Sequence, residues 1–256
     1  FRYIDSKYNT GLAESSFITF RAYRNNNGDK SVFELTPYAD IYLRVSFDSI
    51  DSAQTGSGKG GSIRARKNEK TTLTIEGIAN PNDLVARIYS ADQLADIGDL
   101  SGFLPAEIDL SMGIKLQSIK VGDASPGYEN PKLVRLVLGN NSLLKSIDAR
   151  NCTALNTPIN ASQCVSLREA YFENTLIPSL LIPNGAGIET LHLPASLVYL
   201  QLRNLSKLTD LQIAGYSNLR TIWIENPSEA IMDIVPEMII GLPEGANVRA
   251  TGINIT

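Results

Sequence analysis

The chain of 256 residues is long enough for one large domain or two ordinary ones, and its 23 basic and 27 acidic residues give a net charge of -4. This balance provides no broad basic surface for a phosphate backbone, so we expect no nucleic-acid partner. No apolar run approaches the roughly 18 residues that a membrane-spanning helix needs, so we expect no membrane span.

Residues 1–90 show the alternation of apolar and polar side chains that is typical of half-buried strands, with turn-forming stretches between them. We therefore predict an N-terminal antiparallel β domain that resembles a sandwich and caps the structure that follows. The expected strands are Phe17–Tyr23, Ser31–Leu35, Ile41–Phe47, Ser62–Arg66 and Thr71–Ile75. Leu84–Tyr89 is either the last strand of this domain or the first element of the next one.

The glycine-rich stretch Thr55–Ser62 invites comparison with a phosphate-binding loop. Ala53 stands where that motif needs its first glycine, and Gly60 stands where it needs Ser or Thr after Lys59. The residues that follow have a strand pattern, whereas the motif requires a helix. We interpret the stretch as a hairpin loop and expect no cofactor.

Residues 91–256 are predicted to form a second domain, in which an internal repeat of the form apolar, two others, apolar, one other, apolar runs from Pro105 onward. Units that fit well are Leu116, Ile119, Val121; Leu133, Leu136, Leu138; Leu144, Ile147, Ala149; Leu167, Ala170, Phe172; Ile188, Leu191, Leu193; Leu197, Leu200, Leu202; Leu208, Leu211, Ile213; and Leu219, Ile222, Ile224. Weaker units begin at Pro105, Leu155 and Ile177, and Gly122–Pro131 interrupts the spacing as a turn-rich insertion.

The spacing of roughly eleven residues is half of a usual leucine-rich repeat, which indicates two short strands in each coil. We predict a right-handed solenoid of parallel strands whose apolar positions point inward, so that the chain is mainly β. Prolines at short intervals, such as Pro178, Pro183 and Pro194, argue against a series of amphipathic helices.

The residue three positions after the third apolar position is expected to form a corner of the coil. Asn141, Cys152 and Cys164 occupy this place, and Asn or Cys is the residue type of the leucine-rich-repeat consensus. A buried polar side chain there can bond the turning backbone. Because the two cysteines are on successive half-coils, we expect free buried thiols and no disulfide.

The end of the chain departs from the repeat and then returns to it. Ser228–Ile240 has a helical pattern that Pro236 interrupts. Val248–Ala250 and Ile253 then resume a strand pattern. We therefore expect the solenoid to continue past Thr256 or to be truncated there.

No residue set predicts catalysis or metal binding. His192 is the single histidine and lies between two inward leucines, so we expect an outward side chain on a binding surface and not a metal ligand. The carboxylates Glu107 with Asp109, and Glu169 with Glu173, are the candidates for polysaccharide cleavage. We interpret both pairs as solvated faces and predict a protein that is not an enzyme.

The outward positions should form two rows across the coils. One row contains Lys120, Asp148, Tyr171, His192 and Gln212; the other contains Asp109, Val137, Asn160, Leu181, Gln201 and Trp223. Tyr199 and Arg203 flank Gln201. Because Trp, Tyr and Arg are the residues that most often anchor interfaces, we predict that Leu181, Tyr199, Arg203 and Trp223, together with Tyr171 and His192, contact a partner.

Four stretches resemble the large leucine-rich-repeat proteins of gut bacteriophages and prophages: YSADQLADIGDLSGF, KLVRLVLGNNSLLKSIDARNCTAL, IPNGAGIETLHLPASL and GYSNLRTIWIENP. The resemblance implies a β-rich N-terminal part followed by repeats, a location in the virion, and a tail, baseplate or host-adhesion role without a catalytic motif. Corner residues that depart from the consensus, such as Leu205 and Pro227, leave the coil geometry open.

Three functions follow as hypotheses. The first is a non-enzymatic structural or binding component of a bacteriophage virion, forming a homo-oligomer in an assembly and contacting other virion subunits or a host surface protein or polysaccharide. The second is an extracellular adhesin on a bacterial cell surface, built from the same repeat. The third is a polysaccharide-active enzyme that uses Glu169 or Glu173.

Overall fold

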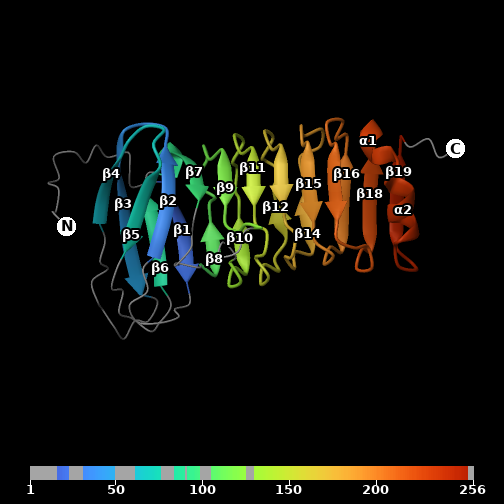
Figure 1. The fold of residues 1–256 in the computed structure, drawn as a ribbon, viewed down its shortest axis with the longest axis horizontal. Coiled ribbons are helices and arrows are strands. Elements are labelled where there is room, and N and C mark those ends of the chain that lie inside the picture. Colours follow the sequence, from blue (N-terminus) through green and yellow to red (C-terminus); the bar gives the residue numbers. More distant parts are fainter. Residues whose placement is uncertain are drawn as a thin grey trace.

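The computed structural model describes residues 16–22, 31–49, 61–75, 84–89, 91–98, 105–124 and 130–252. The described chain is mainly β and elongated, with the N-terminal strands at one end and a stack of coils extending from them (Figure 1). The coils form a parallel-strand β-solenoid of about seven turns. The predicted right-handedness of the coils stays a prediction.

Each coil contributes one strand to each of two faces. Face 1 contains the parallel strands β7 (Leu94–Gly98), β9 (Ser118–Lys120), β11 (Ser146–Asp148), β13 (Glu169–Tyr171), β15 (Thr190–Leu193) and β17 (Asp210–Ile213). Face 2 contains β8 (Glu107–Asp109), β10 (Arg135–Val137), β12 (Ile159–Asn160), β14 (Ser179–Leu181), β16 (Tyr199–Arg203), β18 (Thr221–Glu225) and β19 (Asn247–Thr251). Between β10 and β12 there is no strand ladder, and the Val134 carbonyl instead accepts bonds from the Asn156 N–H (3.4 Å) and the Thr157 hydroxyl (3.2 Å).

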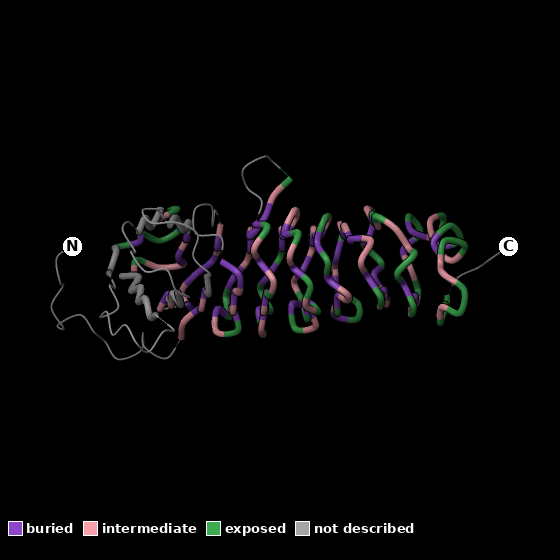
Figure 2. Tube along the Cα trace, turned by 90° about the horizontal axis from the view of Figure 1, so that it is seen from below, coloured by how far each residue is buried: buried purple, intermediate pink, exposed green. Residues whose placement is uncertain are grey.

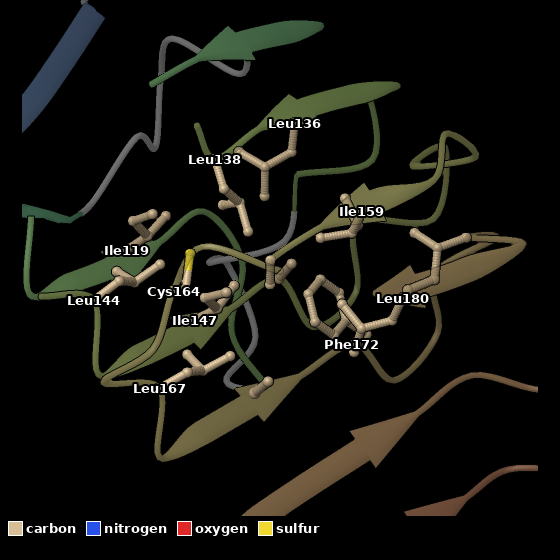
Figure 3. Packing of buried hydrophobic residues seen from close by; sticks show 14 of the residues in the cluster. Ile119, Leu136, Leu138, Leu144, Ile147, Ile159, Cys164, Leu167, Phe172 and Leu180 are labelled. Atoms are coloured by element: carbon tan, nitrogen blue, oxygen red, sulfur yellow. The ribbon is translucent and has the colours of Figure 1, made fainter. Parts of the chain in front are cut away.

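The core lies between the two faces and contains the predicted inward positions (Figures 2 and 3). Side chains from β10, β12 and β14 point toward those of β9, β11 and β13, as Leu136 and Ile147 illustrate. In the units that fit the pattern well, every apolar residue is buried except Ile213, which is half-buried. A fully buried Leu or Ile contributes about 1.5–3 kcal/mol, so the inward rows supply the main stabilisation.

The first coil extends further toward the N-terminus than the repeat pattern indicates. Strand β7 pairs in parallel with β9, so that Ile97 lies beside Ile119, and Leu94 and Ile97 are buried. The repeat pattern requires a third apolar residue at position 99, but Asp99 stands there. The pattern therefore does not reveal this first unit.

The N-terminal strands are antiparallel, as predicted. They are β1 (Phe17–Ala22), β2 (Ser31–Pro37), β3 (Ile41–Ser49), β4 (Gly61–Ala65), β5 (Thr71–Ile75) and β6 (Leu84–Tyr89), followed by the 3-10 turn η2 (Ala91–Gln93). β6 lies between β1 and β3 and therefore belongs with the N-terminal strands. Residues 50–60, which contain most of the predicted hairpin loop Thr55–Ser62, lie outside the described residues, as do residues 125–129 of the insertion Gly122–Pro131.

These strands are continuous with the coils. β1 pairs with β8 of face 2, and β2 pairs with β7 of face 1, both in antiparallel orientation. The Tyr38 hydroxyl donates to the Lys115 carbonyl (2.6 Å) and accepts from Gln117 (2.7 Å). Strand pairing thus crosses the boundary predicted at residues 90/91, and β1 and β2 occupy the edges of the first coil, where the sequence predicts a cap.

Polar side chains bond the backbone at the corners. Asn141 is buried and donates to the carbonyls of Leu110 (3.2 Å) and Leu138. Both cysteines are buried and free, as predicted, and the Cys152 thiol lies 3.5 Å from the Val121 carbonyl oxygen. The corner side chains therefore bond backbone carbonyls at the turns, and the Leu110 carbonyl also accepts from the Gly113 N–H (2.9 Å).

Asparagines in left-handed backbone conformation stack along the turns. Asn151 and Asn174 have φ angles of 60° and 58°, and the Asn174 amide donates to the Asn151 amide oxygen (2.7 Å). On the opposite turn, Asn226 donates in the same way to Asn204 (2.7 Å). Asparagine adopts this conformation at lower cost than most residues, and its side chain links one coil to the next.

The C-terminal helical segment forms two short helices. They are α1 (Glu229–Met232) and α2 (Val235–Ile240), and Pro236 lies in the first turn of α2, where a missing N–H costs little. Ile231, Val235 and Met238 are buried against the coils. β19 then resumes the solenoid in parallel with β18, as predicted. Residues 253–256, including Ile253, lie outside the described residues.

Candidate functional site

The strand register confirms the predicted outward row of face 1 and, pair by pair, parts of the row of face 2. On face 1, Asp148 lies beside Lys120 and Tyr171, Tyr171 beside His192, and His192 beside Gln212. On face 2, Asp109 pairs with Val137, Asn160 with Leu181, and Gln201 with Trp223. The six residues predicted to contact a partner therefore belong to two different faces: Tyr171 and His192 to face 1, and Leu181, Tyr199, Arg203 and Trp223 to face 2.

The four residues on face 2 lie on the successive strands β14, β16 and β18 and are here called the face 2 patch. Leu181 is 38% exposed, and Val198, which precedes Tyr199, is 43% exposed. Tyr199, Arg203 and Trp223 are half-buried, although they occupy outward positions. The difference arises because long side chains on neighbouring strands cover one another.

Trp223 lies between two arginines. The guanidinium carbons of Arg203 on β16 and Arg249 on β19 are 4.1 and 4.2 Å from the centre of the indole ring. Since β16 and β19 flank β18, cation–π contacts link three coils. Arg203 also donates to Glu225 (2.7 Å), and this bond holds the pKa of the Glu225 carboxyl below its usual range. The sequence prediction did not include Arg249. Extending the outward row of face 2 by one coil beyond Trp223 would have included it.

On face 1, His192 is held between two carboxylates. Nδ1 lies 2.7 Å from Glu173 Oε1, and Nε2 lies 3.0 Å from Asp210 Oδ2. A carboxylate only accepts hydrogen bonds, so both ring nitrogens must donate and the imidazole is protonated in this arrangement. Partial burial alone lowers the pKa of His192, but the bonds to Asp210 and Glu173 raise it above its usual value.

This geometry corrects the expectation of a solvent-facing histidine. The His192 side chain points outward from β15 but is only 13% exposed, because Glu173 and Asp210 from adjacent coils enclose it. The sequence prediction missed both partners, which are distant along the chain but adjacent in the register. The ring therefore links three coils and offers little free surface.

The charged contacts continue along face 1. Arg150 donates two bonds to Asp148 (3.0 and 2.6 Å), which raise the pKa of its guanidinium, and its guanidinium carbon lies 4.8 Å from the centre of the Tyr171 ring. Tyr171 meets the His192 ring edge-on at 5.1 Å, and partial burial raises the pKa of its hydroxyl. At the other end, Lys120 pairs with Asp123. Face 1 thus carries a series of side-chain contacts between neighbouring coils, in which the buried Glu173 Oε2 has no hydrogen-bond partner among the described residues.

The carboxylates weighed as catalytic candidates have structural partners. Glu107 lies 3.8 Å from Arg135, and Asp109 accepts a bond from the Ser111 N–H (2.9 Å). Glu173 bonds His192, and Glu169 lies 3.5 Å from the Tyr171 hydroxyl. These contacts stabilise strand ends and neighbouring coils.

Burial raises the pKa of the Cys152 thiol to about 12 and that of Cys164 to about 11. Within the described part of the chain, no group of three or more His, Cys, Asp or Glu side chains could hold a metal ion. None of the described helices has the combined length and apolar character that crossing a membrane requires.

Comparisons of the chain with protein-family models, with curated proteins and with solved structures found no match.

Proposed function

We propose that this chain is a non-enzymatic binding protein that uses the face 2 patch to hold a protein partner. The observation that carries the proposal is the difference between the two outer surfaces. Leu181 on β14 and Val198, directly before β16, expose apolar area, whereas the outward row of face 1 (Lys120, Asp148, Tyr171, His192 and Gln212) contains no aliphatic residue and its His192 and Asp148 are engaged by charged partners. An aromatic and aliphatic centre with arginine beside it is the composition that interface centres favour.

We also propose that the coils are leucine-rich repeats and that the N-terminal strands form a sandwich-like cap on them. Leucine is the commonest residue at the buried inward positions, and Asn141, Cys152 and Cys164 stand at buried corners. In a solenoid, each repeat contacts only its neighbours and leaves an extended outer surface for partners. The repeat interpretation therefore supports a binding role without specifying the partner.

For the biological setting we propose a bacteriophage virion, at the tail or host-adhesion apparatus, where the chain forms part of a homo-oligomeric assembly. The support is the resemblance of the four repeat-containing stretches to phage and prophage proteins. The alternative is an extracellular adhesin on a bacterial cell surface. Cryo-electron microscopy of purified particles, with mass spectrometry of their proteins, distinguishes the two, because only the first places the chain in the particle.

Site-specific crosslinking tests the surface. A photoreactive phenylalanine analogue replaces Leu181 in one variant and Leu143 in the other, because the two leucines are similarly exposed, at 38% and 43%. Leu143 lies on a turn before β11, away from the patch. We expect crosslinks to a partner in the native assembly from position 181 and none from position 143. Equal crosslinking from both positions, or from position 143 alone, would contradict the proposal.

Substitution gives an independent measure once the crosslinked partner is identified. Trp223→Ala removes the ring that both guanidinium groups contact, and the loss of an interface anchor weakens binding by about 2 kcal/mol, or roughly thirtyfold. Circular dichroism and thermal unfolding of the variant establish that the coils remain folded. Unchanged affinity in a folded Trp223→Ala variant would remove the patch as the binding surface.

A further inference from the structure

The turns that lead into the strands of face 2 are stacked, and Arg220 is a charged residue within that stack. The Val198 N–H donates to the Pro178 carbonyl, and the Arg220 N–H donates to the Val198 carbonyl (both 2.8 Å). The Asn247 N–H of the next coil then donates to the Arg220 carbonyl (2.8 Å). Coils of this chain therefore flank Arg220 on both sides, and its exposure does not arise at an end of the solenoid.

The guanidinium group of Arg220 has no carboxylate partner among the described residues. It donates to the Ser217 carbonyl in its own turn (3.4 Å). Arg203, by contrast, donates to Glu225 (2.7 Å). An exposed guanidinium group can pair with a carboxylate through two parallel hydrogen bonds. Arg220 is thus available to an acidic group of another molecule.

Positive charge is in excess on this part of face 2. Strands β14, β16, β18 and β19, with the turn before β18, contain the cations Arg203, Arg220 and Arg249 and the single carboxylate Glu225. The whole chain has a net charge of -4, so the excess is local. Complementary potentials favour a partner whose contact surface is acidic.

The aromatic ring at this surface is not open to stacking. The guanidinium carbons of Arg203 and Arg249 lie 4.1 and 4.2 Å from the centre of the Trp223 ring, and they come from the strands on either side of β18. Nucleic-acid bases and sugar rings bind aromatic side chains by stacking on free faces. Leu181 and Val198 instead offer exposed aliphatic surface. This combination favours protein side chains, aliphatic ones beside acidic ones.

We propose that the partner of the face 2 patch is a separate protein that presents a carboxylate to Arg220 and aliphatic side chains to Val198 and Leu181. This inference rests on the proposed function, because it names the chemistry of the partner that the patch holds. Within this chain, the face 1 carboxylates Glu173 and Asp210 are already bonded to His192. The complementary charge is therefore expected from another protein.

Zero-length crosslinking tests the acidic contact. Arg220→Lys places a primary amine at this position. A water-soluble carbodiimide activates a nearby carboxylate, which the amine attacks to form an amide with release of a urea. We expect mass spectrometry of the native assembly to find an amide between residue 220 and an Asp or Glu of the partner. Lys207, an exposed amine on the turn before β17, is the internal control and should form no amide with that partner.

Affinity for the protein that crosslinks from position 181 gives a second measure. Arg220→Glu reverses the charge and should weaken binding by at least about tenfold, because an attraction becomes a repulsion. Arg220→Lys keeps the charge and should weaken binding by less than about threefold. Lys207→Glu makes the same change in net charge away from the patch and should leave affinity unchanged. The effect of Arg220→Glu should shrink as ionic strength rises, since salt screens charge pairs.

The outcomes separate this inference from the proposed function. If position 181 crosslinks to a partner but residue 220 forms no amide, or Arg220→Glu binds with unchanged affinity, the acidic contact is overturned and the proposed function stands. Equal weakening by Lys207→Glu overturns the contact as well, because the effect would then come from net charge. An amide to another copy of this chain would identify a second copy as the occupant and overturn the proposal. Absence of crosslinks from position 181 removes the proposed function and this inference together.

Discussion

The two faces of the solenoid have the same interior and different exteriors. Leu191 on face 1 and Leu200 on face 2 are both fully buried at the centre of an inward row. Outside, His192 is enclosed by carboxylates from neighbouring coils, whereas Leu181 remains 38% exposed. The inward rows determine the fold, and the outward rows are free to differ because each coil needs only its inner positions to stack. This freedom is compatible with the binding role that we propose for face 2.

The largest expected effect tests the equivalence of the two interiors. Leu191→Ala and Leu200→Ala should each lower the free energy of unfolding by about 2–5 kcal/mol, because each leaves a cavity between stacked coils. Urea denaturation followed by circular dichroism measures both losses. If one substitution lowered the free energy of unfolding strongly and the other hardly at all, the two faces would not share one core.

The next effect concerns a corner between the faces. Asn141→Leu keeps the number and branching of the side-chain heavy atoms but removes the bonds to the carbonyls of Leu110 and Leu138. The Leu110 carbonyl keeps the bond from the Gly113 N–H, so the loss at the Leu138 carbonyl dominates and costs about 1–3 kcal/mol, which the same denaturation experiment detects. Leu143→Ala, two residues away and exposed, is the control and should change stability by less than about 0.5 kcal/mol. Equal effects would mean that the corner bonds contribute nothing.

The interior was predictable from the sequence because stacking imposes a strict spacing on it. Leu116, Ile119 and Val121 already show the period, and the parallel register follows from aligning equivalent positions. The unit at Leu94 and Ile97 was missed because a polar Asp99 ends it. Short irregular units thus escape a pattern search even where the structure continues the fold.

The candidate site was predictable in position but not in contacts. The sequence placed Tyr171, His192 and Trp223 on the outer rows, and the register agrees. It did not reveal that His192 is enclosed or that Arg249 covers Trp223, because these contacts depend on side-chain reach between coils. Exposure of a long side chain is set by its neighbours, and a repeat pattern carries no information about them.

A pH-dependent effect distinguishes the charged exterior of face 1. The raised pKa of His192 means that its bridge stabilises the fold fully below the histidine pKa of the unfolded chain, about 6.5, and that this contribution disappears as pH rises through the folded pKa. The lowered pKa of Asp210 sets the acidic limit, since the contribution is lost again as pH falls through that value.

His192→Gln should therefore cost most in mildly acidic solution, by about 1 kcal/mol after allowance for the exposure of Asp210, and less above neutral pH. Thermal unfolding of both proteins across pH measures the difference. Gln212→Glu places a carboxylate beside His192 in the register and should raise the histidine pKa further, moving the loss to higher pH. A stability difference that does not change with pH would show that the bridge is not ionic.

The smallest effect on stability is expected on face 2, where it separates folding from binding. Leu181→Ser removes exposed apolar area from β14 and should change the free energy of unfolding by no more than about 0.5 kcal/mol. Its effect on partner affinity should be larger, because apolar area at the centre of an interface is withdrawn from water only in the complex. Denaturation and binding measured on the same variant give the two values. If Leu181→Ser instead lowered stability and left partner affinity unchanged, the proposed difference between the faces would be wrong. The outer row of face 2 would then stabilise the fold, as the outer row of face 1 does.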